Sequence, residues 1–253
     1  MSSRLSRLLP VYLVVFVGFL GYSLMIAVFT PMMLRNDNGM LPASSSTAQR
    51  SVILGVLLAL YPLGQFIGSP ILGALSDRYG RRRILIVSLG ATTALYAAIA
   101  SALAIQSLAL LMVASFLAGL SEANVVIAQG AIADAASRED RERLFGYIYL
   151  SASLAYVVGP LGGGKLADRS LASWFGYQTP YWAVAILLLV VLVAITLWFK
   201  ETSRQTGEQS GYLEAFTNLR RVVTDRRLRG LYWINFVLYL AIFGFFRVYP
   251  MYL

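Results

Sequence analysis

The sequence predicts an all-α, multi-pass membrane protein, built as a six-helix bundle followed by a seventh transmembrane helix. Hydrophobic residues make up 58% of the 253 residues and charged residues only 13%, whereas soluble domains carry about 25% charged residues. The apolar residues gather in uncharged runs that are long enough to cross a bilayer, which takes about 20 residues. Most basic residues fall in alternate loops between these runs, as they do in multi-pass membrane proteins.

Each span is predicted from one apolar run. The uncharged run from Ile84 to Ser121 is too long for one crossing, so the polar pair Gln106-Ser107 is interpreted as a tight turn between two helices. The runs are apolar on every face, which excludes the alternating strands of a membrane β-barrel. The predicted spans are Val11–Leu34, Ser51–Leu75, Ile84–Ile105, Leu108–Ala131, Leu144–Gly164, Tyr181–Phe199 and Leu231–Leu253.

The basic residues also predict the orientation. The N-terminus and the loops after spans two, four and six hold most of the 21 lysines and arginines. Because cytoplasmic loops carry the excess of basic residues, we expect a cytoplasmic N-terminus in a plasma membrane of the bacterial inner-membrane type. The same distribution explains the net charge of +9, so we expect the lipid bilayer, and no nucleic acid, as a partner.

Three segments follow from this topology. Residues 1–200 form the predicted bundle, residues 201–230 a cytoplasmic linker, and residues 231–253 the start of a second, incomplete bundle. Inside the bundle, Gly73-Ala-Leu-Ser-Asp-Arg78 recurs as Gly164-Lys-Leu-Ala-Asp-Arg169. The two copies end spans that leave the membrane on opposite faces, which is what an inverted three-plus-three repeat predicts.

The segment that closes span two has the most specific pattern in the chain. Gly73, Asp77, Arg78, Gly80 and Arg81 lie in the sequence GALSDRYGRR between two apolar runs. A glycine allows helices to approach closely, a second glycine permits a tight turn, and the carboxylate can pair with the arginines. This segment resembles the loop after span two in the major facilitator superfamily of transporters.

The resemblance extends to the exit of span four and to span five. It implies that Asp134 and Arg141 join Asp77 and Arg78 in a cytoplasmic charge cluster that opens and closes with alternating access. Span five is similar to the antiporter signature of the family, although Ala155 replaces one glycine of the pattern. The matching residues of span five are Gly146, Gly159, Pro160, Gly163 and Gly164.

The implied function is secondary active transport, with proton-coupled export of small organic molecules or drugs. Uptake symport of a metabolite such as a sugar, an amino acid or a siderophore is the alternative in the same fold. The chain has no cysteine and no histidine, which removes thiolate and imidazole metal ligands and the commonest general base. We therefore expect no enzyme, metal or cofactor, and we expect protons and a small molecule as ligands.

Glu122 is the candidate for proton coupling, because it is the only acidic residue well inside a span. Intramembrane charges are costly and tend to face the bundle interior or a water-filled cavity. In a continuous helix, Ser115, Gly119, Glu122, Val126 and Gln129 share one face, with Ser115 where such exporters often carry arginine. The alternative is a structural hydrogen bond from Glu122 to a neighbouring helix. The other pocket candidates are Gln65, Gln129, Tyr149 and Tyr156.

The seventh span is expected to belong to a second bundle. Transporters of this type close a cavity between two similar bundles. We therefore expect the second half to come from a longer chain, of which this is a truncated part, or from a second copy in a homodimer.

The topology is testable by cysteine labelling, because the chain contains no cysteine of its own. Ser46→Cys, in the predicted outer loop, should react with a membrane-impermeant maleimide added outside intact cells. Labelling that occurs only from the cytoplasmic side would reverse the orientation.

Overall fold

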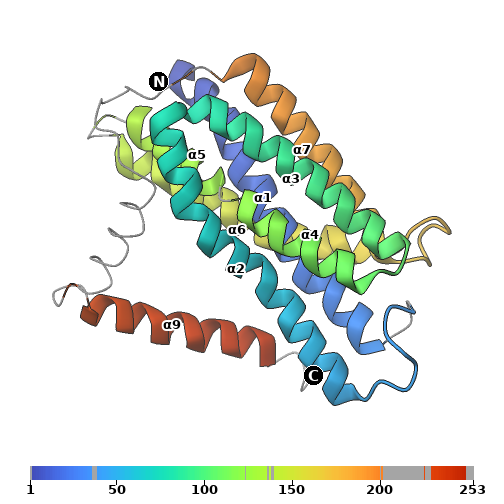
Figure 1. Ribbon diagram of the computed structural model, residues 1–253. Helices are drawn as coiled ribbons and strands as arrows, with labels where there is room; N and C mark the ends of the chain where they lie inside the picture. Colours follow the sequence, from blue (N-terminus) through green and yellow to red (C-terminus); the bar gives the residue numbers. More distant parts are fainter. Residues whose placement is uncertain are drawn as a thin grey trace. The chain divides into compact units, whose positions relative to one another are not determined.

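The computed structural model describes residues 2–35, 39–122, 124–135, 137, 140–199, 201, 225 and 229–248 (Figure 1). The chain divides into two units, Met1–Glu208 and Gln209–Leu253, and each is considered by itself. The helices are α1 (Ser2–Arg35), α2 (Thr47–Tyr79), α3 (Arg81–Ala104), α4 (Leu108–Ser121), α5 (Asn124–Ala135), α6 (Arg141–Ala167), α7 (Thr179–Trp198) and α9 (Arg229–Val248).

The predicted all-α membrane fold is confirmed. In the described part of the chain, six helical stretches are long and apolar enough to cross a membrane, with α4 and α5 together making up the fourth. Helix α9 forms where the seventh span was predicted and begins at Arg229 rather than Leu231. The linker residues 202–224 and 226–228 lie outside the described residues.

The short connections use the residues that the turns require. Gln106 has φ of +58°, and the Ser107 side chain caps α4 by accepting a hydrogen bond from the Leu110 N–H. The predicted hairpin is therefore present. Gly80 alone joins α2 to α3 with φ of +95°, a conformation that residues with a Cβ rarely adopt.

Span four, predicted as one helix over Leu108–Ala131, is described as two helices, α4 and α5, and Ala123 between them lies outside the described residues. Helix α4 ends at Ser121, and the Glu122 N–H is shared between the carbonyls of Ala118 and Gly119, which tightens the last turn. The two helices together still make one stretch long and apolar enough to cross a membrane. Along the predicted face, Glu122 is buried while Val126 is 38% exposed.

Three helix pairs dominate the packing of the bundle: α1 with α6, α2 with α4, and α3 with α7. An inverted repeat equates α1, α2 and α3 with α4/α5, α6 and α7. Exchanging the two halves then turns the α1–α6 pair into the α4–α2 pair and leaves the α3–α7 pair unchanged. The contacts in the structure therefore agree with the repeat that the two copies of the GxL[SA]DR pattern predicted.

Small residues allow the α2–α4 pair to approach very closely. A Cβ added to Gly64 would press against the Phe116 carbonyl oxygen, and one added to Gly68 would press against the Leu120 carbonyl oxygen. From the other side, a Cβ on Gly119 would meet the Tyr61 carbonyl oxygen. The two backbones are therefore in direct contact, as at other close helix crossings in membranes.

The α1–α6 pair repeats this arrangement. A Cβ on Gly159 would press against the Ser23 side chain, and Ala155 is fully buried at the same contact. The Ser23 hydroxyl donates to the Ala155 carbonyl at 3.1 Å. Ala155 and Gly159 precede Gly164 by the same spacing at which Gly64 and Gly68 precede Gly73. The sequence repeat and the packing repeat thus coincide.

The close α2–α4 contact predicts a sharp difference between two glycines of α2. Gly68→Ala should lower the free energy of unfolding by about 1–3 kcal/mol, because the added methyl group overpacks the contact with Leu120. Gly55→Ala is the matched control, since no neighbouring atom lies within 4 Å of its added Cβ. Thermal unfolding in detergent measures both, and equal stability of the two variants would contradict the packing.

Candidate functional site

Two groups of polar residues stand out in the bundle. The first, here called the Arg81 cluster, comprises Asp77, Arg81, Asp134 and Glu201 at the junction of α2 and α3. The second, here called the Glu122 site, comprises Glu122, Tyr96 and Tyr181 inside the bundle. A pocket at the end of α1 is a third feature.

Arg81 is the centre of the first group. One terminal guanidinium nitrogen lies 2.6 Å from an Asp77 oxygen, and Nε lies 3.1 Å from an Asp134 oxygen. The other terminal nitrogen donates to the Ser76 hydroxyl at 2.8 Å. The Arg81 side chain is only 13% exposed. One guanidinium therefore links the end of α2, the start of α3 and the last turn of α5.

Glu201 caps the start of α3. Its carboxylate accepts hydrogen bonds from the Arg81 N–H at 3.0 Å and from the Arg82 N–H at 3.1 Å. The first N–H groups of a helix need such partners, and Gly80 has no side chain to supply one. Arg82 also donates to the Thr196 carbonyl at 2.6 Å, so the start of α3 is tied to the end of α7 twice.

Two carboxylates and one arginine of the predicted charge cluster lie together. Arg81 stands between Asp77 and Asp134. The Arg78 guanidinium lies 5.3 Å from the centre of the Tyr79 ring, and Arg141 is exposed at the start of α6. The cap by Glu201 was not predicted, because no local pattern indicates a contact over so long a sequence separation.

The glycines of the two motifs have separate places. Gly73 faces Val126 of α5, and Gly163 packs against Leu24 of α1. Gly146 has no neighbour near its added Cβ, and Pro160 lies exposed inside α6. The antiporter-like motif therefore contributes mainly to the α1–α6 contact, through Gly159 and Gly163.

Glu122 lies at the break between α4 and α5 and is only 1% exposed. The Tyr96 hydroxyl of α3 donates to one carboxyl oxygen at 3.2 Å. The second oxygen, Oε1, has no hydrogen-bond partner within the described residues, and it is the atom that a Cβ on Gly18 of α1 would meet first. Thus the carboxyl group is enclosed between α1, α3 and the break.

Two glycines of α1 make room for this site. A side chain on Gly18 would press against the Glu122 carboxyl group, and one on Gly21 would overlap the Tyr96 hydroxyl. Beside them, the Thr92 and Ser121 hydroxyls form a buried hydrogen bond of 3.1 Å between α3 and α4. Sequence analysis missed Tyr96, Gly18 and Gly21. Glycines one turn apart in the first span were the available signal.

The other pocket candidates are not gathered around Glu122. Tyr149 is 70% exposed, and Tyr156 is 39% exposed, with its ring 5.8 Å from the ring of Phe19. Gln65 and Gln129 are half-buried on α2 and α5. In the part of the chain that is described, none of these four is hydrogen-bonded to Glu122.

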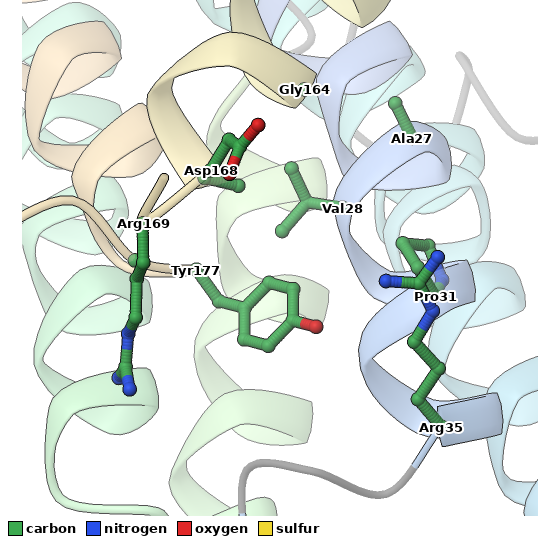
Figure 2. Close-up of a pocket in the computed structure, with 10 residues that line it drawn as sticks. Ala27, Val28, Pro31, Arg35, Gly164, Asp168, Arg169 and Tyr177 are labelled. Atoms are coloured by element: carbon green, nitrogen blue, oxygen red, sulfur yellow. The ribbon is translucent and has the colours of Figure 1, made fainter. Parts of the chain in front are cut away.

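A pocket of about 530 Å³ lies between the end of α1 and the connection from α6 to α7 (Figure 2). The Asp168 carboxylate at its rim accepts a hydrogen bond from the Ser170 N–H at 2.8 Å, and the hydrogen bonds from Ser170 lower the pKa of Asp168. Asp168 therefore holds a turn, whereas its counterpart Asp77 pairs with Arg81. The lining residues are Ala27, Val28, Pro31, Arg35, Gly164, Ala167, Asp168, Arg169, Gly176 and Tyr177.

The chain is similar to several bacterial resistance proteins. It is 41% identical over 133 residues to the class C tetracycline resistance protein of Escherichia coli, covering 53% of this chain and 31% of that protein. It is 36% identical over 148 residues to the class B protein of the same organism, covering 58% and 35%. It is 26% identical over 229 residues to multidrug resistance protein 2 of Bacillus subtilis (strain 168), covering 88% and 51%. The chain thus spans about a third to a half of the length of these relatives.

Solved structures show the same fold. The human organic anion transporter MFSD10 aligns with a TM-score of 0.66 at 22% identity, covering 83% of this chain and 52% of that one. The proton:xylose symporter XylE aligns with a TM-score of 0.65 at 17% identity, covering 88% and 51%.

The family profile of the Major Facilitator Superfamily matches residues 11–253, which is nearly the whole chain. Together with the helix arrangement and the bacterial relatives, this match shows that the chain belongs to the Major Facilitator Superfamily of membrane transporters.

Proposed function

We propose that this protein exports small organic molecules in exchange for protons, by alternating access across the plasma membrane, with its N-terminus in the cytoplasm. The observation that carries the proposal of export is the similarity to tetracycline and multidrug resistance proteins, at 26–41% identity. The solved neighbours include a sugar symporter, but at that identity the likeness concerns the fold and not the direction of transport.

Glu122 is the proposed proton-coupling group. An ionised carboxylate inside the bundle is costly unless it is paired. Its hydrogen-bond partner in the described residues is the neutral hydroxyl of Tyr96. Ser115, where related exporters often carry arginine, is also buried and supplies no charge. The neutral form of Glu122 is therefore compatible with the close helix packing around it, and the ionised form requires that packing to open.

The Glu122 site adjoins surfaces that are able to move. Its carboxyl group faces α1 at Gly18, which has no side chain to interlock with it. Rocking of helices around a buried site is the usual form of alternating access. Loss of the proton would leave a charged carboxylate at the contact with α1 and favour the state in which water reaches Glu122. Proton release would thereby be coupled to opening of the bundle at this contact.

The Arg81 cluster is the proposed gate on the cytoplasmic side. Under the proposed orientation, the loop after span two lies in the cytoplasm. Arg81 joins two carboxylates from α2 and α5, and Glu201 ties the chain after α7 to α3. These bonds lie near the surface, so they are weak enough to break and re-form during a transport cycle.

The second half of the transporter completes the cavity in this proposal. Residues 1–200 would be the first bundle, residues 201–230 the linker, and residues 231–253 the start of the second bundle. A further segment of a longer chain, or a second copy, would then cover the faces of the first bundle that line the cavity.

Neutralising Asp77 tests the gate. Asp77→Asn removes one of the two carboxylates on Arg81, so transport by the full-length protein should fall severalfold in inverted membrane vesicles. Membrane insertion should stay intact, because Asp77 lies at the exposed end of α2. Glu142→Gln, at the exposed start of α6, is the control. If Asp77→Asn transports as fast as Glu142→Gln, the Arg81 cluster is not the gate.

Glu122→Gln tests proton coupling. The amide keeps the size of the acid but cannot release a proton, so drug-driven proton flux should be lost and the pH dependence of transport should flatten. The measurement is proton flux and drug accumulation in inverted vesicles, with the full-length protein and with Glu142→Gln as the matched control. If transport and its pH dependence both survive in Glu122→Gln, the carboxyl group serves only as a structural bond.

A further inference from the structure

Two buried tyrosines of neighbouring helices lie close together, and one of them contacts Glu122. Tyr96 of α3 and Tyr181 of α7 are both completely buried, and their ring centres are 6.4 Å apart. The Tyr96 hydroxyl donates a hydrogen bond to Glu122. Three side chains with exchangeable protons are therefore gathered inside the bundle.

Tyr181 stands near the pocket in the sequence. It follows Tyr177 by four residues, and Tyr177, in the connection before α7, lines the pocket (Figure 2). The Tyr181 ring stacks on Phe29 at 5.4 Å, and Phe29 follows Val28, another lining residue. Asp168 and Arg169 at the rim are exposed, so the pocket is open to water.

The Tyr181 hydroxyl has no evident structural purpose. It is buried without a hydrogen-bond partner in the part of the chain that the structure describes, and such a group costs free energy that a phenylalanine at the same position would avoid. The stacking on Phe29 needs only the ring. An orphaned polar group at a buried position calls for a functional explanation.

We propose that protons travel between the pocket and Glu122 through the hydroxyl groups of Tyr181 and Tyr96. The inference rests on the proposed role of Glu122 as the coupling group. In the inward step, a hydronium ion in the pocket gives a proton to Tyr181 and becomes water, as Tyr181 passes its own proton on, through a bridging water molecule, to Tyr96. Tyr96 in turn gives its proton to the Glu122 carboxylate. One proton moves, and both tyrosines end neutral.

The surroundings of Glu122 favour this route. Helix α1 presents Gly18 and Gly21, which have no side chain. On the α5 side the apolar Val125 lies beside Gly18, and Ser121 is engaged with Thr92. Tyr96 of α3 is thus the titratable group that contacts the carboxyl group within the described residues, and Tyr181 of α7 is the titratable group behind it.

Infrared spectroscopy can follow proton exchange at Glu122 without a transport assay. The carbonyl stretch of the protonated acid is assigned by its disappearance in Glu122→Gln, at a pH where the band is present. The protein is then transferred from water to deuterium oxide, and the rate at which the band shifts reports exchange at the carboxyl group. Tyr181→Phe should slow this rate on the order of a hundredfold, as loss of a positioned proton-transfer group does.

Tyr61→Phe is the matched control. Tyr61 is also buried and stacks on Tyr22 at 5.3 Å, but it belongs to the contact between α1 and α2. The control should exchange at the wild-type rate. Tyr181→His, which restores a proton-carrying group, should recover part of the rate that Tyr181→Phe loses, and thermal unfolding verifies that all variants fold.

An unchanged exchange rate in Tyr181→Phe, or equal slowing in Tyr61→Phe, would overturn the route. The fate of the proposed function is read separately. If the route is wrong but the coupling role is right, Glu122→Gln still abolishes coupled transport. The exchange rate at the Glu122 carboxyl group is then the same in Tyr181→Phe as in the wild type. If the coupling role is wrong, Glu122→Gln transports normally, whatever the exchange rates are.

Discussion

Direct backbone contact at the two equivalent helix crossings is the constraint on which the rest of this bundle depends. In a bilayer, helices gain little from burying apolar side chains against one another, so close packing of small residues must hold them together. Gly64 and Gly68 bring α2 onto α4, and Ala155 and Gly159 bring α6 onto α1. Glu122 lies at the end of α4 and faces Gly18 of α1, so each crossing holds one of the helices that enclose it.

The sequence predicted the features that arise from local chemistry. Long apolar runs must be helical in a membrane because each backbone group needs a partner, so the spans were found, and polar Gln106-Ser107 marked the hairpin. The break at Glu122 could not be found in this way, since neither proline nor glycine stands in Ser121-Glu-Ala-Asn124. In the described residues, the end of α4 is marked by the Glu122 N–H shared between two carbonyls, and hydrophobic periodicity does not reveal such a bond.

In the candidate sites too, contacts within one motif were predictable from the sequence and contacts between distant segments were not. Asp77 and Arg81 are four residues apart, and the sequence placed both in one motif. Their partners Asp134 and Glu201 come from distant segments, and only the fold decides which arginine reaches them. For Glu122, the residue type and the span were predictable from the sequence but its partner was not, because the contact with Tyr96 joins two different spans.

The break in span four connects the two sites mechanically. Helix α5 has 12 residues, a length of about 18 Å at 1.5 Å per residue. It begins just after Glu122 and carries Asp134, a partner of Arg81, in its last turn. The tight contact with α2 belongs to α4, and the contact with Arg81 belongs to α5. Under the proposed function, a change of charge at Glu122 acts on one end of a short rigid helix, and the gate carboxylate moves at the other.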